Sequence, residues 1–436
     1  MDPTTTFGET MKKSLSVLTA LGVAASGLLF AAPAAAAQVP AAQVPAAAYV
    51  PGSDAQCSAE PQYFAYYRTW RDKYASWPGS ENEPENPAFN EQRMDDLPRG
   101  VDVAFVFSNY VSDDSRFWDV LRDEYVPNLH AQGTKLVRTV DIGVILDAPT
   151  ADTPEAYDAA AEQILAEYVT DDGLDGLDVD MERELSAAQV NRAAGVFEAL
   201  SAHIGPQSGT DRLFVYDTNK EGTHPLTARI APYVSYVLVQ SYGRQVSGLQ
   251  RTWDSYAPYF HPCQYLIGFS FYEERGADWG DTRDPFETSR AAQYAQWQPQ
   301  GATKGGIFSY AVDRDGKLVG DDTITRSDFS WSKRLIAMQD EAAGVTPAAP
   351  PAPTATLGAD KATVTGTGVA GAEVRLTTSG KGRLPSPATA VVGSDGTWTA
   401  TLDRPVRPPM TVSVTQRWWD TADSDAATLT GHPVWG

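Results

Sequence analysis

The stretch Asp175-Gly176-Leu177-Asp178-Val179-Asp180-Met181-Glu182 decides both the fold and the chemistry of this chain. From Asp178 to Glu182 a carboxylate recurs at every second residue, with large apolar residues between. Residues two apart in a β-strand share a face, so the carboxylates point one way and the apolar side chains point the other. The pattern therefore predicts a strand with one face packed against helices and one face lined with acids.

Seven further apolar runs surround this stretch and alternate with helical segments such as 154–169 and 187–203. The runs lie at 62–67, 101–107, 135–140, 213–216, 236–240, 265–271 and 305–310. Eight strands with helical crossovers predict an α/β fold, a (β/α)8 TIM barrel, in which the acidic stretch is the fourth strand. A doubly wound open sheet is the alternative, but no Gly-rich phosphate loop follows the first run.

The position of the acids predicts catalysis at the C-terminal mouth of the barrel, where active sites of this fold lie. Crowded carboxylates cannot all ionise, so at least one keeps a proton near neutral pH and can act as a general acid. Glu182, nearest the mouth, is the natural acid. A calcium loop, a two-metal site and a solvated charge run are the other readings, and the strand-like alternation and lack of His disfavour them.

The stretch matches the Asp-Gly-x-Asp-x-Asp-x-Glu motif and so resembles glycoside hydrolase family 18. That family is an exception to the two-carboxylate schemes, because catalysis is assisted by the substrate. The resemblance implies that Glu182 protonates the glycosidic oxygen while the substrate's 2-acetamido group attacks its own anomeric carbon. Asp180 would stabilise the resulting oxazolinium with Asp178 behind it, and water would complete a retaining hydrolysis.

Nearly the whole predicted barrel also resembles the secreted bacterial endo-β-N-acetylglucosaminidases that deglycosylate immunoglobulin G. The stretches that carry this likeness are 67–73, 102–107, 239–243, 268–274 and 304–316. The resemblance implies cleavage of the GlcNAc-β1,4-GlcNAc chitobiose core of N-linked glycans, with a glycoprotein such as immunoglobulin G as the partner. It implies no cofactor and no metal.

The resemblance also assigns site residues on other strands. Tyr242 matches a tyrosine that holds the acetamido carbonyl, and Gln240 lies beside it on the same face of the sixth strand. Further candidates for substrate binding stand at strand ends: Tyr310, Glu273, Glu274, Tyr67 and Arg138. Barrel-core packing is the alternative role for the aromatic residues.

Two loops depart from the immunoglobulin-directed enzymes. Val140-Asp141-Ile142-Gly143 stands where a Trp-bearing loop is expected, and Ser108-Asn109-Tyr110 replaces a His-containing loop. Such loops contact glycan antennae and the partner protein, so the sequence leaves open the antibody specificity and the glycan type.

The remaining segments predict a secreted protein of two folded parts. Residues 1–37 are typical of a signal peptide, with a basic start, an apolar stretch and small residues for cleavage; a membrane anchor is the alternative. We expect a linker at 38–60, the barrel at 61–343 and a Pro/Ala linker at 344–353. Residues 354–436 show short alternating runs typical of an immunoglobulin-like β-sandwich, either a spacer or a binding module.

Charge and cysteine content narrow the partners. The net charge of −22 disfavours nucleic acid and anionic lipid, and we expect a monomer with no membrane contact after cleavage. Cys57 and Cys263, the two cysteines, each precede a predicted strand, so they would meet at the N-terminal face of the barrel and could form a disulfide.

Three other functions remain in view. A chitinase would use the same mechanism, and a catalytically silent chitinase-like lectin would use the same fold. The presence of Glu182 disfavours the lectin. A peptidase lacks a supporting motif in the chain.

Overall fold

The computed structural model describes residues 58, 60–76, 91–108, 111–379, 389–393, 395–408 and 410–430. The segment predicted as a signal peptide lies outside them, as do Cys57 and the loop residues Asn109 and Tyr110. The disulfide between Cys57 and Cys263 therefore stays a prediction.

Eight parallel strands close into a barrel in sequence order, with β1 paired to both β2 and β8. The strands are β1 (Gln62–Arg68), β2 (Val103–Phe107), β3 (Lys135–Asp141), β4 (Gly176–Met181), β5 (Leu213–Thr218), β6 (Tyr236–Gln240), β7 (Tyr265–Ser270) and β8 (Gly306–Tyr310). Every expected run forms one of these strands, and the predicted TIM-barrel fold is confirmed.

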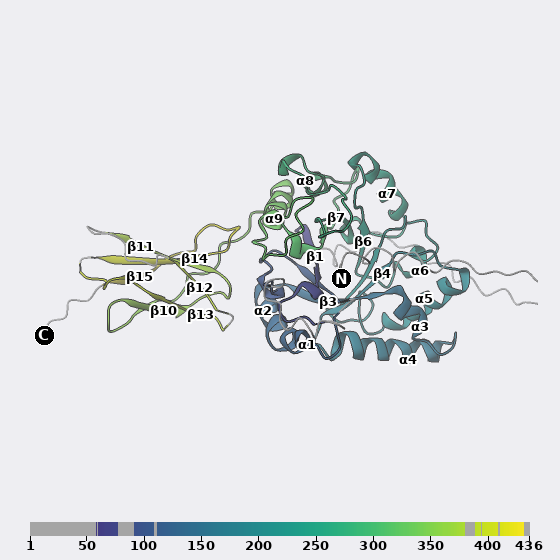
Figure 1. Cartoon of the computed structure of the whole chain (residues 1–436), viewed down its shortest axis with the longest axis horizontal. Helices are drawn as coiled ribbons and strands as arrows, with labels where there is room; N and C mark the ends of the chain where they lie inside the picture. The colour runs from purple at the N-terminus through teal and green to yellow at the C-terminus, as the bar shows by residue number, and fades with distance from the viewer. Residues whose placement is uncertain are drawn as a thin grey trace, which may run out of the picture. The chain divides into compact units, whose positions relative to one another are not determined.

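Helices surround the strands (Figure 1). They are α1 (Arg116–Val120), α2 (Val126–Gln132), α3 (Ile142–Asp147), α4 (Pro154–Leu165), α5 (Ala187–Leu200), α6 (Thr227–Ile230), α7 (Leu249–Tyr256), α8 (Arg290–Gln296) and α9 (Ser330–Ala343). The helical segments predicted at 154–169 and 187–203 correspond to α4 and α5, and each begins at a capping residue. Thr153 caps α4, and Ser186 caps α5 through a reciprocal capping box with Gln189. Beyond Leu165 the helical path of α4 continues as a π-helical turn to Thr170.

The two faces of each barrel strand contribute to two different apolar clusters. One lies inside the barrel and includes Phe64, Val215 and Phe308. The other lies between strands and helices, and it contains the apolar residues of β4, which are Leu177, Val179 and Met181. Each fully buried side chain of this kind stabilises the fold by roughly 1.5–3 kcal/mol. The apolar face of β4 is therefore tied to the helices, and its acidic face is left to the interior.

The C-terminal part is a β-sandwich of two antiparallel sheets. One sheet has the order β13 (Thr397–Thr401), β10 (Thr363–Thr367), β9 (Thr356–Leu357). The other has the order β12 (Thr389–Val391), β11 (Glu373–Ser379), β14 (Thr411–Arg417), β15 (Ala427–Thr430). Alternate residues such as Val374, Trp398 and Val414 fill the core between them. This confirms the predicted second fold.

Among the helices of the described residues, none combines the length and the apolar character needed to cross a lipid bilayer.

Candidate active site

The acidic face of β4 opens toward the mouth of the barrel. Asp178 is completely buried, Asp180 is partly buried, and Glu182, just beyond the strand, is exposed. Asp175, at the opposite end, accepts hydrogen bonds from the backbone of Leu136 and contacts His130, both at 2.7 Å. Asp175 therefore supports the start of the strand, away from the mouth.

Asp178 is held by two hydroxyl groups from neighbouring strands. Its Oδ2 atom accepts hydrogen bonds from Tyr66 at 2.9 Å and from Thr139 at 3.0 Å. Burial, and after it the charge of Asp180, raises the pKa of Asp178 well above its usual value, although these hydrogen bonds oppose the rise. Asp178 can therefore take up a proton, and it lies deeper in the barrel than the more exposed acids.

Asp180 lies between carboxylates on both neighbouring strands. In the parallel ladders its partners are Asp141 on β3 and Asp217 on β5. Burial is the largest cause that raises the pKa of Asp180, to about 9, followed by the charges of Asp217, Glu182 and Asp141. With no sugar bound, Asp180 therefore keeps its proton at neutral pH, and a protonated carboxyl is a poor nucleophile.

Gln240 joins Asp180 to Asp217. Its Nε2 atom donates to Asp217 at 2.9 Å and to Asp180 at 3.3 Å. Asp217 was not among the predicted site residues, because the fifth apolar run was ended at Tyr216. Extending its alternation by one residue would have placed Asp217 on the same inward face as Val215.

A row of aromatic side chains crosses the mouth. Successive ring centroids lie 5.7 Å apart for Trp70 and Phe107, 5.8 Å for Phe107 and Tyr310, 6.1 Å for Tyr310 and Tyr242, and 5.9 Å for Tyr242 and Trp279. Trp279 is 43% exposed. Burial, and after it nearby charges that include Asp217, Asp180 and Glu182, raise the pKa of Tyr242, so its hydroxyl keeps its hydrogen for donation.

Tyr242 and Gln240 thus lie together with the acids, and Tyr310 lies beside Tyr242. Trp70, Phe107 and Trp279 received no role from the sequence. Aromatic residues also fill cores, so only their placement at the mouth distinguishes them.

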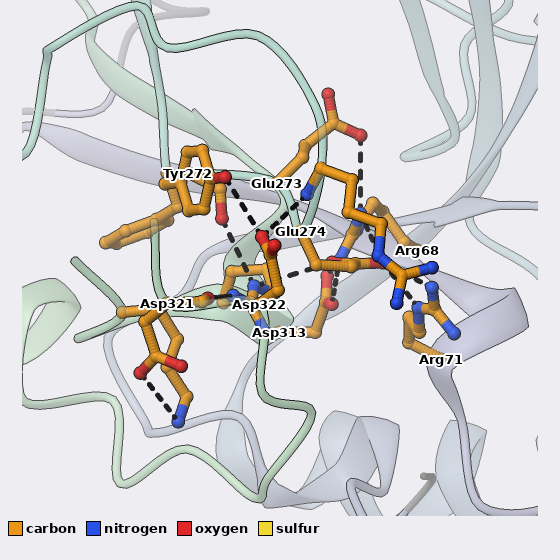
Figure 2. A network of polar contacts seen from close by, with 12 residues as sticks. Arg68, Arg71, Tyr272, Glu273, Glu274, Asp313, Asp321 and Asp322 are labelled. Carbon is orange, nitrogen blue, oxygen red and sulfur yellow. Dashed lines mark hydrogen bonds and ion pairs between the residues drawn. The ribbon is translucent and has the colours of Figure 1, made fainter. Parts of the chain in front are cut away.

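A buried arginine, Arg68, organises a network of polar contacts at the rim of the mouth (Figure 2). Arg68, at the end of β1, is 1% exposed. Its guanidinium donates to Asp313 at 2.6 and 3.0 Å, to Glu274 at 2.8 Å and to Glu273 at 3.3 Å. Arg71 also binds Glu274, at 2.7 Å through its Nε atom. The loops that follow β7 and β8 are therefore tied to β1.

This network gives Glu273 and Glu274 different roles. Burial would raise the pKa of Glu274, but the charges of Arg68 and Arg71 outweigh it and lower the pKa to about 2. Both Glu274 oxygens are occupied by guanidinium groups. Glu273 is less enclosed, with 27% of its side chain exposed, and its Oε2 atom accepts a hydrogen bond from the Tyr310 hydroxyl at 3.3 Å. Of the two, Glu273 is the one available to a ligand.

Two predicted binding residues point away from the mouth, and these predictions are wrong. Tyr67 is buried on the outer face of β1, where its hydroxyl donates to Asp72 at 2.8 Å. Arg138 lies on the outer face of β3, 3.8 Å from Asp172 and stacked 4.2 Å from the centroid of the Trp118 ring. Both β1 and β3 are buried on two faces, so their sequences alternate too little to reveal which residues face inward.

The junction between β3 and α3, where the sequence departs from the expected pattern, carries charge instead of an aromatic side chain. Asp141 accepts hydrogen bonds from the Arg183 guanidinium at 2.7 Å and from the backbone of Gly143 at 2.6 Å. This side of the mouth is therefore polar, in contrast to the aromatic row.

The acids of the mouth lack the grouping of a metal site. Among the described residues, no cluster of three or more His, Cys, Asp or Glu side chains is arranged to hold a metal ion. The arrangement can donate a proton from Glu182, hold a proton shared by Asp178 and Asp180, and place Tyr242 and Gln240 around one polar group.

The chain matches two known protein families. Residues 65–309 match the endo-beta-N-acetylglucosaminidase EndoS TIM-barrel domain, and residues 349–432 match a bacterial Ig domain. Endo-beta-N-acetylglucosaminidase F2 of Elizabethkingia meningoseptica is 38% identical over 296 residues, which are 66% of this chain and 83% of that protein.

Larger relatives match a similar share of this chain. EndoS of Streptococcus pyogenes serotype M1 is 37% identical, and the matched part covers 63% of this chain but only 33% of EndoS. EndoSd of Streptococcus dysgalactiae is 36% identical, with 39% of its length covered. This chain therefore spans well under half of these two streptococcal proteins.

A solved structure supports the same relationship. The endo-beta-N-acetylglucosaminidase of Cordyceps militaris is 46% identical, with a TM-score of 0.60, over 66% of this chain and 93% of that one. The same enzyme was solved in mutant form in complex with fucosyl-N-acetylglucosamine-Asn.

Proposed function

The chain belongs to the endo-beta-N-acetylglucosaminidase EndoS TIM-barrel family, and from this premise we propose that it hydrolyses the GlcNAc-β1,4-GlcNAc core of N-linked glycans. One N-acetylglucosamine would remain on the glycoprotein. The observation that carries the proposal is the grouping of Asp180, Gln240 and Tyr242 beside Glu182, since this grouping suits a sugar with an acetamido group.

The reaction begins with proton transfer from Glu182 to the glycosidic oxygen. As the bond to the leaving sugar breaks, the acetamido carbonyl oxygen bonds to the anomeric carbon and forms an oxazolinium. Tyr242 donates to that carbonyl, and Asp180 accepts from the acetamido N–H. Asp178 and Asp180 share one proton, and the developing positive charge favours ionisation of Asp180, so that this proton moves onto Asp178. Water then attacks the anomeric carbon and displaces the acetamido oxygen, while Glu182 takes a proton from the water, and the configuration is retained.

The pKa of Asp180 supports substrate assistance over a protein nucleophile. A carboxyl group with a pKa of about 9 is protonated in the empty site at neutral pH. The acetamido oxygen of the substrate needs no deprotonation to attack. The protein then has only to orient that group and to stabilise the charge that develops on it.

The rim next to Tyr310 is suited to the sugars beyond the cleaved bond. Tyr310 offers a ring face, and Glu273 offers a carboxylate that can accept hydrogen bonds from mannose hydroxyls. Glu274 acts through the network that holds the rim, since its oxygens already bind arginines.

Mass measurement on a panel of glycoproteins tests the function. After incubation, each N-glycosylation site should lose all of its glycan except one N-acetylglucosamine. High-mannose, hybrid and complex glycoforms should be tested separately, with immunoglobulin G among the substrates. Unchanged mass for every type would refute the proposal, and release of soluble oligomers from chitin instead would identify a chitinase.

The likeness to the Cordyceps militaris enzyme extends the proposal to core-fucosylated glycans, because that enzyme was solved with fucosyl-N-acetylglucosamine-Asn bound. Matched glycopeptides with and without core fucose test this extension. We expect kcat/KM values for the two to agree within about tenfold. Cleavage of the unfucosylated peptide alone would limit the substrate class without affecting the main proposal.

We also propose that the protein is secreted, because its N-linked glycoprotein substrates lie outside the cell. The small residues up to Ala37 support cleavage after this position. N-terminal sequencing of protein from culture medium should find a mature chain that begins at Gln38. Retention of the apolar segment in membranes would instead indicate an anchor.

A further inference from the structure

Asp217 is a third buried carboxyl group at the centre of the site, and nothing above assigns it a part in the reaction. It lies on β5, directly opposite Asp180 in the ladder, and is only 2% exposed. Its strand neighbour Val215 belongs to the cluster inside the barrel, which places Asp217 on the inward face. The side chain therefore lies beneath the bound sugar and away from solvent.

The hydrogen bonds around Asp217 indicate its protonation state. Gln240 donates to its Oδ2 atom at 2.9 Å, but its Oδ1 atom has no hydrogen-bond partner among the described residues. The hydroxyl group of Tyr66 also lies beside Asp217. The single hydrogen of the Tyr66 hydroxyl is already donated to Asp178 at 2.9 Å. A hydrogen bond between Tyr66 and Asp217 therefore requires Asp217 to be the donor.

The side chains around Asp217 also favour its protonated form. Asp178 and Asp180 face it from β4 and Glu182 faces it from just beyond that strand, while Tyr66 faces it from β1 and Gln240 from β6. None of these groups is a cation. A buried carboxylate without a cation and without its full set of donors is strongly unfavourable, and a bound proton relieves both deficits. Burial and then the charge of Asp178 raise the pKa of Asp217 accordingly.

We propose that Asp217 is a positioning residue that acts in its neutral, protonated form. Its proton is donated to the Tyr66 hydroxyl, while its carbonyl oxygen anchors the amide of Gln240. This proposal rests on the proposed function, because its purpose is the orientation of Asp180 toward an acetamido group.

The consequence for catalysis follows through Gln240. Its amide nitrogen has two hydrogens, one for Asp217 at 2.9 Å and one for Asp180 at 3.3 Å. The shorter bond fixes the amide plane, so that the second hydrogen points at Asp180. A neutral Asp217 also leaves Asp180 as the carboxyl that can ionise when the oxazolinium forms, because an ionised Asp217 would oppose that charge.

Two substitutions separate this proposal from a purely structural role. Asp217→Asn keeps the shape and the neutral charge, and its amide can donate to Tyr66 and accept from Gln240. We expect kcat/KM of this variant at pH 7 to stay within about fivefold of the wild type. Asp217→Ala removes both contacts, and we expect kcat to fall by at least about tenfold, with a smaller change in KM. Asp211→Asn, in the exposed turn before β5, is the matched control and should leave both constants unchanged.

An infrared difference spectrum of the wild type minus Asp217→Asn reports the proton directly. At pH 7 it should contain the carbonyl band of a protonated carboxyl. Absence of this band, or a loss of activity in Asp217→Asn as large as in Asp217→Ala, overturns the proposal. The band is measured without substrate, so it tests Asp217 even if the wild type cleaves no N-glycan, an outcome that would refute only the proposed function. Thermal unfolding confirms that each variant is folded before its activity is compared.

Discussion

Asp180 on β4 lies directly opposite Asp217 on β5, in register within a parallel ladder. Two carboxyl groups placed side by side in a buried site repel each other when ionised, so the fold carries an electrostatic cost at its catalytic centre. The cost has measurable consequences for stability as well as for catalysis.

Asp180→Asn should stabilise the protein, and the effect should grow with pH. The pKa of Asp180 is raised to about 9 in the folded state from 3.8, so the folded state holds a proton that the unfolded state has released. Stability is then lost as pH rises from about 4 to about 9, and Asn avoids this loss. We expect a gain of roughly 1–3 kcal/mol at pH 8 and less at pH 5. Urea unfolding measures it, with Asp211→Asn as the control. Equal gains at both pH values would contradict the assignment.

Glu182→Gln should abolish hydrolysis while glycan binding persists. The amide cannot donate an acidic proton, so we expect kcat to fall by about 10²–10⁴-fold. Glu184→Gln is the matched control, because Glu184 is an exposed side chain two residues further along. Calorimetric titration with the released glycan measures binding by both variants. Hydrolysis that survives in Glu182→Gln would show that another group is the acid.

Tyr242→Phe and Tyr310→Phe should behave differently although both remove one hydroxyl. The Tyr242 hydroxyl is proposed to stabilise the reacting acetamido group, so its loss should lower kcat by about 10²–10³-fold. The Tyr310 hydroxyl donates to Glu273 at 3.3 Å, away from the reacting atoms. Its loss should lower kcat/KM by less than about fivefold. Steady-state kinetics on one defined glycopeptide compares them, and similar losses would count against the role of Tyr242.

Arg68→Met should destabilise the barrel. Arg68 is buried and neutralises Asp313, Glu273 and Glu274, so its removal leaves uncompensated carboxylates. We expect a loss of about 3–5 kcal/mol in the free energy of unfolding. Arg283→Met is the control, since Arg283 is exposed and pairs with Asp278. Equal effects of the two substitutions would rule out a special role for the buried network.

Glu273→Gln and Glu274→Gln should separate binding from stability. Glu273→Gln weakens an acceptor for sugar hydroxyls, and we expect KM to rise about three- to tenfold with little change in stability. Glu274 has its pKa lowered to about 2 by Arg68 and Arg71 against the effect of burial. Its ionised form therefore contributes stability above about pH 4.5, and this contribution is lost as pH falls toward 2.

Glu274→Gln should accordingly destabilise the protein by roughly 1–3 kcal/mol at pH 7. It should leave KM unchanged in the folded enzyme. Chemical unfolding at pH 7 and at pH 3 provides the comparison, and an effect of Glu274→Gln that is as large at pH 3 as at pH 7 would argue against the ion pairs.

The barrel strands and the carboxylates of β4 were predictable because the alternation that reveals them is a local feature of the sequence. On β4 the apolar and acidic residues alternate, so the sequence shows which side chains share a face. On β1 and β3 both faces are buried, and the alternation is lost. This is why Tyr67 was expected at the mouth, whereas its neighbour Tyr66 is the residue that contacts Asp178.

The sequence by itself determined the order of the strands, the direction of the β4 carboxylates and the family to which the chain belongs. Only the tertiary structure decided that Asp217 stands beside Asp180, and that Glu274 is bound by arginines while Glu273 remains available. The physical reason is that alternation along one strand is a property of neighbouring residues. The partners of a buried charge come from other strands, and closure of the barrel brings them within hydrogen-bonding distance.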